Sequence, residues 1–165
     1  MAEYTNNIKG WMGKEELQFL YDRAGEMSDI VEIGSYLGRS THALLSGCNG
    51  KVIAIDTWKG GKLIPMDGTE YDKFLENIKG VGQLTTIIGD SVETAKTIEP
   101  VDMVFLDGDH TYEGVKGDIE AWLPKAKKLI CGHDHDPEFP GVIKAVSELI
   151  GEVDVIDSIW FKWIK

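Results

Sequence analysis

The sequence predicts an α/β fold in which a doubly wound, Rossmann-like and mostly parallel sheet ends in a C-terminal antiparallel hairpin. Short apolar runs rich in β-branched residues recur along the 165-residue chain, with helix-like segments between them. Such an alternation is typical of parallel strands joined by crossover helices. The last two apolar runs are separated only by Asp157 and Ser158, a spacing that favours a tight hairpin.

The expected elements alternate in a regular order. The apolar runs DIVEI, KVIAI, TTII, MVFL and LIC predict strands at residues 29–33, 51–55, 85–88, 103–106 and 129–131. Helices are expected at residues 14–24, 40–45, 71–78, 91–98, 114–123 and 141–149. Several of them begin at Ser, Thr or Asp and end near Gly or Pro, as helices commonly do. The hairpin would pair residues 153–156 with residues 159–164.

The chain length is that of a single domain. We expect residues 1–165 to form one unit, with a helical N-terminal segment at 1–28, a βα core at 29–150 and the terminal hairpin at 151–165.

Charge and composition narrow the classes of partner. The formal net charge of −11 repels phosphate backbones and anionic membrane surfaces, so neither nucleic acid nor a membrane is an expected partner. The first residues lack the layout of a secretory signal, and Cys48 and Cys131 show no CxxC spacing. A cytoplasmic location with reduced cysteines is therefore expected.

A glycine-containing turn follows the first expected strand. Glu32, Gly34 and Gly38 lie where this strand passes into a helix, and such a turn lets the backbone approach a ligand closely. The same glycines would also serve a purely structural tight turn.

Acidic residues stand at the ends of successive expected strands. Glu32, Asp56, Asp90 and Asp107 end or follow the first four, and the pair His133-Asp134 follows the fifth. Open α/β sheets bind ligands beyond the carboxyl ends of their strands, so these side chains are expected to share one site. Asp residues also favour loops and helix starts for local reasons, and Asp90 or Ser91 would cap the helix that follows.

Asp56 lies about twenty residues after the glycine turn, the place from which a carboxylate accepts the hydroxyls of a ribose. The turn lacks the third glycine of the GxGxxG pattern that binds a dinucleotide, which disfavours an NAD-linked oxidoreductase. Trp58 would either stack on adenine or be buried for structural reasons.

The motifs together resemble class I S-adenosylmethionine-dependent methyltransferases, in the compact group related to macrolide-sugar O-methyltransferases and cephalosporin hydroxylase-like proteins. The resemblance rests on VEIGSYLGRST at 31–41, IDTW at 55–58, GDS at 89–91, FLDGDHTY at 105–112 and GHD at 132–134. It implies S-adenosylmethionine as cofactor. The residues that it implies around this cofactor are Glu32, Gly34, Ser35, Tyr36, Gly38, Ser40, Asp56, Thr57, Trp58, Gly89, Asp90, Ser91 and Asp107.

The resemblance also implies chemistry at the ends of the fourth and fifth strands. His110 is the first candidate for the base that removes a hydroxyl proton, and Asp107 is the second. Asp107, His133 and Asp134 stand where related enzymes hold Mg²⁺ or another divalent cation, although His133 departs from the usual ligand pair. Without a metal, His133 and Asp134 would fix the loop, and Asp109 and His110 would cap a helix.

The expected function is O-methylation of a sugar or another small-molecule hydroxyl, with a glycan as an alternative acceptor and with a homo-oligomer as the expected assembly. Two other functions stay open. One is a nucleoside- or metal-binding protein of the same fold without methyl transfer. The other is a metallohydrolase that uses the run His133-Asp134-His135-Asp136.

Overall fold

The computed structural model describes residues 3–60 and 64–165. In chain order the helices and strands are α1 (Lys14–Ala24), β1 (Asp29–Ile33), α2 (Arg39–Gly47), β2 (Lys51–Asp56), α3 (Glu70–Asn77), β3 (Gln83–Ile88), α4 (Ser91–Ala95), β4 (Val101–Leu106), α5 (Tyr112–Trp122), the 3₁₀ turn η1 (Leu123–Lys125), β5 (Ala126–Gly132), α6 (Pro140–Leu149), β6 (Asp154–Ile156) and β7 (Ile159–Trp163).

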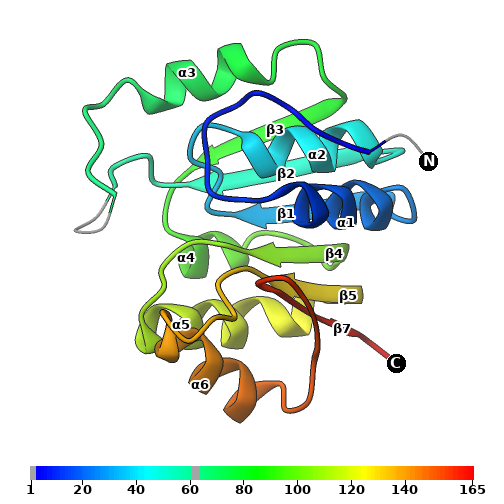
Figure 1. Ribbon diagram of the computed structural model, residues 1–165, viewed down its shortest axis with the longest axis vertical. Coiled ribbons are helices and arrows are strands. Elements are labelled where there is room, and N and C mark those ends of the chain that lie inside the picture. Colours follow the sequence, from blue (N-terminus) through cyan, green and yellow to red (C-terminus); the bar gives the residue numbers. More distant parts are fainter. Residues whose placement is uncertain (1–2, 61–63) are drawn as a thin grey trace.

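The seven strands form one sheet in the order β3-β2-β1-β4-β5-β7-β6 (Figure 1). β1 to β5 are parallel, whereas β7 runs antiparallel to both β5 and β6. The strand order reverses between β1 and β4, which is the place where open α/β sheets bind ligands. The predicted fold class, including the terminal antiparallel hairpin, is confirmed.

Two apolar clusters pack on opposite faces of the sheet. Alternate residues of one strand point to opposite faces, so Ile30 joins the first cluster and Val31 joins the second. The first cluster contains buried residues of α1, α2 and α3, and the second contains those of α4, α5 and α6. The helices thus cover both faces and leave the strand ends as the surface on which polar groups gather.

Two element boundaries differ by three residues from the sequence prediction, and the others lie within two residues of it. α4 ends at Ala95 and not at residue 98, because the next backbone N–H groups, of Lys96 and Thr97, bond in tighter turns to Glu93 and Thr94. β5 begins at Ala126, three residues earlier than expected, because Ala126 pairs with Val101 across a register irregularity in β4. Neither difference moves a residue at the carboxyl ends of the strands.

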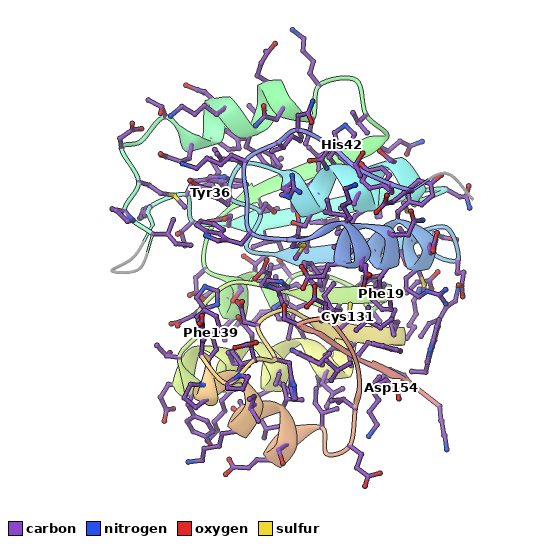
Figure 2. All side chains as sticks on the ribbon, in the orientation of Figure 1. Phe19, Tyr36, His42, Cys131, Phe139 and Asp154 are labelled. Atoms are coloured by element: carbon purple, nitrogen blue, oxygen red, sulfur yellow. The ribbon has the colours of Figure 1, made fainter. Side chains whose placement is uncertain are left out.

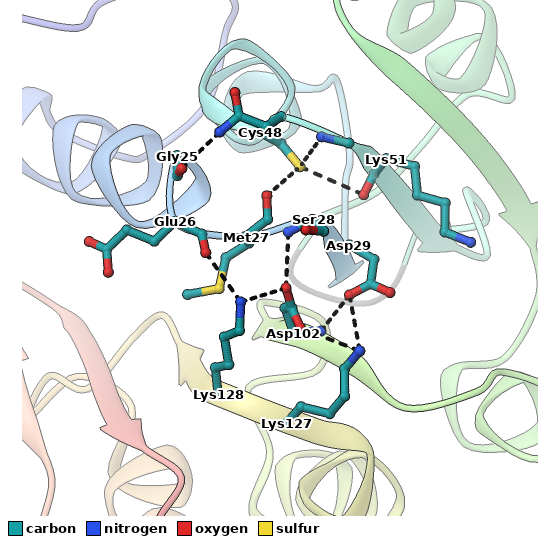
Figure 3. A network of polar contacts seen from close by, with 12 residues as sticks. Gly25, Glu26, Met27, Ser28, Asp29, Cys48, Lys51, Asp102, Lys127 and Lys128 are labelled. Atoms are coloured by element: carbon teal, nitrogen blue, oxygen red, sulfur yellow. Dashed lines mark hydrogen bonds and ion pairs between the residues drawn. The ribbon is translucent and has the colours of Figure 1, made fainter.

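A charged network ties the amino-terminal ends of the strands together (Figure 3). The carboxylate of Asp102, with a side chain 9% exposed, accepts hydrogen bonds from the Ser28 N–H at 3.0 Å and from Lys128 Nζ at 2.8 Å. Lys127 Nζ lies 3.3 Å from its other oxygen. Burial alone would raise the pKa of Asp102, but the bonds from Lys128, Ser28 and Lys127 outweigh it and lower the pKa.

Asp102→Ala is expected to lower the free energy of unfolding by about 1.5–3 kcal/mol near neutral pH. The substitution removes a buried carboxylate, so the Ser28 N–H and the two lysines lose their acceptor. Since the folded state lowers the pKa of Asp102, the wild type keeps this contribution above the unfolded pKa and loses it as the pH falls through the folded value. Urea unfolding at pH 7 and near pH 3 should therefore give a smaller difference at the lower pH. An equal difference at both, or an equal loss in the exposed-acid control Asp72→Ala, would contradict this account.

Candidate functional site

The carboxyl ends of the parallel strands lie along one edge of the molecule. The arrows of β1 to β4 point to the left in Figure 1, and Figure 2 places Tyr36 and Phe139 on that same side. Tyr36 belongs to the loop after β1, and Phe139 precedes α6. The loops between these two rings carry the polar residues that the sequence singled out.

The glycine turn brings two loops into contact. Gly34 has a φ of 84°, and a Cβ placed there would lie 2.0 Å from the carbonyl oxygen of Asp107. Gly38 has a φ of 90°, and its Cβ would lie 2.9 Å from Ile78 of the segment after α3. The first glycine is needed for the close approach of the loops after β1 and β4, and the second for the packing of α2 against α3.

The buried side chain of Glu32 holds this turn in place through hydrogen bonds. Its fully buried carboxylate accepts hydrogen bonds from the hydroxyls of Ser35 at 2.7 Å, Ser40 at 2.6 Å and Thr41 at 2.5 Å. Burial raises the pKa of Glu32, and the three hydroxyls oppose that effect. The carboxylate therefore holds the turn to the start of α2, and its contact with a cofactor stays a prediction.

Asp56 joins the end of β2 to the glycine turn. Its Oδ2 accepts the N–H groups of Ser35 and Tyr36, both at 2.9 Å, and its Oδ1 accepts the N–H of Trp58 at 2.8 Å. A carboxylate offers about four acceptor positions, so about one remains, on Oδ1, for a hydroxyl of a ligand. The neighbouring Thr57 accepts the N–H of Lys59 at 3.3 Å.

Trp58 is 6% exposed and is held by packing. Its ring centroid lies 4.7 Å from that of Tyr71 and 5.0 Å from that of Phe74, and its Nε1 donates to the Tyr36 carbonyl at 2.8 Å. The structure thus gives the ring a packing role, and stacking on adenine stays a prediction.

The GDS motif forms the start of α4. Asp90 accepts the N–H of Glu93 at 2.9 Å, which is the N-cap expected from its position. The N–H of Gly89 donates to the Asp56 carbonyl at 3.0 Å, so the motif lies beside the end of β2. Ser91 donates its hydroxyl to Asp118. The cap is observed, and a contact to adenine remains a prediction.

His110 is oriented by Asp134, across the gap between the loops after β4 and β5. His110 Nδ1 lies 2.6 Å from Asp134 Oδ2, and Phe139 packs on the imidazole with ring centroids 5.1 Å apart. This hydrogen bond raises the pKa of His110, although burial opposes the shift. With Nδ1 engaged, Nε2 is the nitrogen left for a ligand.

His133 lies between carboxylates on both sides of its ring. Nδ1 is 3.0 Å from Asp134 Oδ1, and Nε2 is 2.9 Å from Oε1 of Glu16 in α1. Burial alone would lower the pKa of His133, but its hydrogen bonds to Asp134 and Glu16 outweigh burial and raise it. Ionised carboxylates only accept hydrogen bonds, so carboxylates beside both nitrogens favour the doubly protonated ring.

Glu16 and Ser158 are site residues that the sequence reasoning missed. Glu16 is 3% exposed, and its Oε1 also accepts the hydroxyl of Ser158 at 2.6 Å. One signal was available, because Glu16 shares a helical stripe with the buried Leu20 and Ala24. A carboxylate on an apolar stripe requires a partner, but its identity depends on the tertiary fold.

Among the acidic side chains of the site, Asp107 has the fewest hydrogen-bond partners. No hydrogen bond from the described residues reaches its side chain, and the nearest cation is His133 Nδ1 at 3.6 Å. Burial raises the pKa of Asp107 to about 8, and the charge of Asp134 adds to this shift.

Asp107, His110 and Asp134 together offer three donor atoms within 4.8 Å of one another, a set that suits a divalent cation. The predicted third ligand His133 is not part of this set, in which His110 takes its place.

A small cavity, with room for about one water molecule, forms the base of a cleft between the loops after β4 and β5. It is lined by Leu106, Asp107, Gly108, Asp109, His110, Val115, Asp118, His133, Asp134, Val142 and Trp160. Most of the polar side chains in this lining are acidic or imidazole groups, as proton removal or cation binding requires. Asp56 and the glycine turn lie outside this lining, and the close approach of Gly34 to the Asp107 backbone joins the two predicted halves of the site.

This sheet order, with a glycine turn after β1 and an acid at the end of β2, is the fold of a class I S-adenosylmethionine-dependent methyltransferase. The profile of a family described as a methyltransferase domain matches residues 31–135. The chain belongs to that family, as the sequence resemblance predicted.

Three solved structures share the fold. Cofactor-bound Rv0187 from MTB is 17% identical, with a TM-score of 0.74 over 94% of this chain and 82% of that chain. An O-methyltransferase from Bacillus cereus, in complex with SAH, is 20% identical, with a TM-score of 0.62 over 90% and 79%. An rRNA methylase from Streptococcus thermophilus is 16% identical, with a TM-score of 0.64 over 90% and 93%.

A curated relative, the uncharacterized protein y4gI of Sinorhizobium fredii, is 29% identical over 116 residues, which is 64% of this chain. The chain spans only 13% of the length of that protein. Among residues 3–60 and 64–165, no helix has both the length and the apolar character needed to cross a membrane.

Proposed function

We propose that the chain transfers the methyl group of S-adenosylmethionine to a hydroxyl of a sugar or another small molecule, with His110 as the proton acceptor. The observation that carries the proposal is the bond between His110 Nδ1 and Asp134 Oδ2, at 2.6 Å, beside the cleft after β4. It fixes the imidazole and leaves Nε2 to accept a proton.

The cofactor is assigned to the loops after β1, β2 and β3. Asp56 retains acceptor capacity for a ribose hydroxyl, and the loop around Gly34 approaches the reactive loop so closely that no Cβ fits. Gly89 and Asp90, beside Asp56, are the groups proposed to meet the adenine. When bound, S-adenosylmethionine supplies an electrophilic methyl group.

In the proposed reaction a side chain of the protein, His110, removes the hydroxyl proton. Asp134 raises the pKa of His110 above the ordinary imidazole value near ~6.5, so the ring is a stronger base and must be deprotonated before it accepts the hydroxyl proton. Asp134 stabilises the charge that His110 gains, and the packed Phe139 restrains the ring. Asp107, with few partners of its own, would accept a hydrogen bond from the acceptor hydroxyl or bind a cation that does so.

In this reaction the carboxylates of Asp107 and Asp134 would hold a divalent cation such as Mg²⁺, while His110 keeps Nε2 free for the proton. Two carboxylates close together in a buried place repel each other, and a cation would relieve that repulsion. Such an ion would supply a positive charge that orients the acceptor oxygen.

The metallohydrolase alternative is less well supported, because its four residues do not converge. The backbone N–H of His135 donates to the Ser158 carbonyl at 2.9 Å, and Asp136 accepts the N–H of Glu138 at 2.9 Å in a local turn. A protein that binds the cofactor without methyl transfer remains the second alternative, and loss of His110 would then change no activity.

The proposed acceptor is a small molecule and not nucleic acid, because the net charge of −11 disfavours a polyanion. The free Cys48 and Cys131 fit a cytoplasmic location. A homo-oligomer would help to cover the acceptor.

The test is a transfer assay with methyl-labelled S-adenosylmethionine and panels of sugars, phenols and structured RNA. We expect label on a sugar or another small hydroxyl compound, with transfer falling after EDTA treatment and returning on addition of Mg²⁺. Label on RNA alone would overturn the acceptor class. Transfer that is unchanged by EDTA would remove the cation and leave Asp107 to act on the acceptor directly.

Asp56→Ala is expected to weaken the binding of S-adenosylhomocysteine by ~1–3 kcal/mol, the value of the hydrogen bond lost to a ribose hydroxyl. Isothermal titration calorimetry of the folded variant measures this change. The control Asp72→Ala removes the same charge from the exposed surface of α3 and should bind like the wild type. Equal affinities for the Asp56 variant and the wild type would remove Asp56 from the cofactor site.

A further inference from the structure

A buried carboxylate from α1 reaches the reactive end of the sheet. Glu16 uses its two oxygens differently: Oε2 accepts the N–H of Gly13 at 2.7 Å and caps α1, whereas Oε1 accepts from His133 Nε2 at 2.9 Å and from the hydroxyl of Ser158 at 2.6 Å. Helix capping needs only the first oxygen, so the second requires another explanation.

From Glu16 a hydrogen bond and two ion-pair contacts lead in sequence to the proposed base. Glu16 Oε1 holds His133 Nε2, and His133 Nδ1 lies 3.0 Å from Asp134 Oδ1. The other oxygen of that carboxylate, Asp134 Oδ2, lies 2.6 Å from His110 Nδ1. His110 is therefore oriented by a carboxylate that itself contacts the His133 ring, and this ring is held by a second carboxylate.

Ser158 locks the near end of this series of contacts. It lies in the turn between β6 and β7, and both its hydroxyl and its backbone N–H, the latter at 3.2 Å, donate to Glu16 Oε1. The terminal hairpin and α1 thus meet at His133. Glu16 and Ser158 both lie outside residues 31–135, the region matched by the family profile.

Ser158, His133 and Asp134 also have the order of a hydrolytic triad, with Ser158 Oγ 3.0 Å from His133 Nε2. The direction of the Ser158 hydrogen bond argues against that role, because its hydroxyl donates to Glu16 Oε1 at 2.6 Å and not to the imidazole that would activate it.

We infer that Glu16, locked by Ser158, is a positioning residue that sets the orientation and tautomer of His110 through His133 and Asp134. This inference rests on the proposed function for its effect on the reaction. The geometry of this series of contacts does not depend on methyl transfer, so the two can be tested separately.

Glu16→Gln is the variant of choice, because it keeps the size of the side chain. The carboxylate has two acceptor oxygens, whereas the amide has one oxygen and one NH₂ donor. The amide oxygen can therefore accept from the Gly13 N–H or from His133 Nε2, but not from both as Glu16 does. Glu15→Gln is the matched control, since Glu15 is the adjacent exposed residue of α1. Ser158→Ala is the second variant, which removes one donor to Glu16 and keeps the carboxylate.

The first readout is the ¹⁵N spectrum of the histidine side chains, with His110→Asn used to assign the His110 signals. We expect a single Nδ1–H form of His110 in the wild type and in Glu15→Gln, and a loss of that form in Glu16→Gln, with a weaker loss in Ser158→Ala. A wild-type His110 spectrum in folded Glu16→Gln would overturn the inference. If Glu16→Gln does not fold, an unchanged His110 spectrum in Ser158→Ala would overturn it.

The second readout compares kcat with the affinity for S-adenosylhomocysteine. In Glu16→Gln we expect kcat to fall ~10–100-fold, as for other residues that orient site ligands from behind. The affinity for S-adenosylhomocysteine should stay within twofold of the wild type, which a general loss of structure would not permit. If the wild type transfers no methyl group to any acceptor, the proposed function fails, and the spectra still decide whether Glu16 positions His110.

Discussion

His110→Ala is expected to slow methyl transfer by ~10²–10⁴-fold, the usual contribution of a positioned general base. The structure places this imidazole beside the cleft after β4, with Nδ1 bonded to Asp134 and Phe139 packed on the ring. Nothing in the proposed cofactor site depends on the ring. S-adenosylhomocysteine should therefore bind the variant almost as well as the wild type.

Single-turnover kinetics with the wild type, His110→Ala and His135→Ala separate this role from a structural one. His135 is a suitable control because it lies in the same region of the chain, and its backbone N–H, not its ring, makes the bond to Ser158. A rate for His110→Ala equal to that of the wild type would remove His110 from the mechanism. A slow rate that comes with lost cofactor affinity would instead make the ring a structural element.

Gly34→Ala is expected to lower the free energy of unfolding by roughly 2–6 kcal/mol, the sum of backbone strain and of a forced steric contact. The φ of 84° disfavours any residue with a Cβ, and that atom would lie 2.0 Å from the Asp107 carbonyl oxygen. The loops after β1 and β4 must then separate. Cofactor binding and the cleft beside Asp107 should suffer together.

Gly80→Ala isolates the two contributions. Gly80 has a similar φ of 78°, but a Cβ there meets nothing within 4 Å, so this variant reports backbone strain alone. Urea unfolding should show a much larger loss for Gly34→Ala than for Gly80→Ala. Equal losses would show that the loops after β1 and β4 do not need their close approach.

Local signals made the fold and one edge of the site predictable. The ends of β1 and β2 could be located in the sequence, because Glu32 stands next to the last residue of the first apolar run and Asp56 closes the second. Since parallel strands end on the same side of a sheet, the clustering of these acids followed from the order of elements alone. The glycine turn was also readable, because few residues other than glycine tolerate a positive φ.

The partners inside the site were not predictable in the same way. Glu16 precedes His133 by 117 residues, and no local pattern tells which of several buried polar groups a carboxylate on α1 will meet. The predicted metal role of His133 rested on its place after β5. Whether its nitrogens are free depends on Glu16 and Asp134, which only the tertiary fold brings to the ring.

The loops around Asp56 and the glycine turn are proposed to bind the nucleoside of S-adenosylmethionine. The most direct measurement is a calorimetric titration of the purified protein with S-adenosylhomocysteine, with and without Mg²⁺, and with NAD as the comparison ligand. We expect the protein to bind S-adenosylhomocysteine saturably and not to bind NAD. Binding of NAD alone, or binding of neither ligand under any condition, would contradict this proposal.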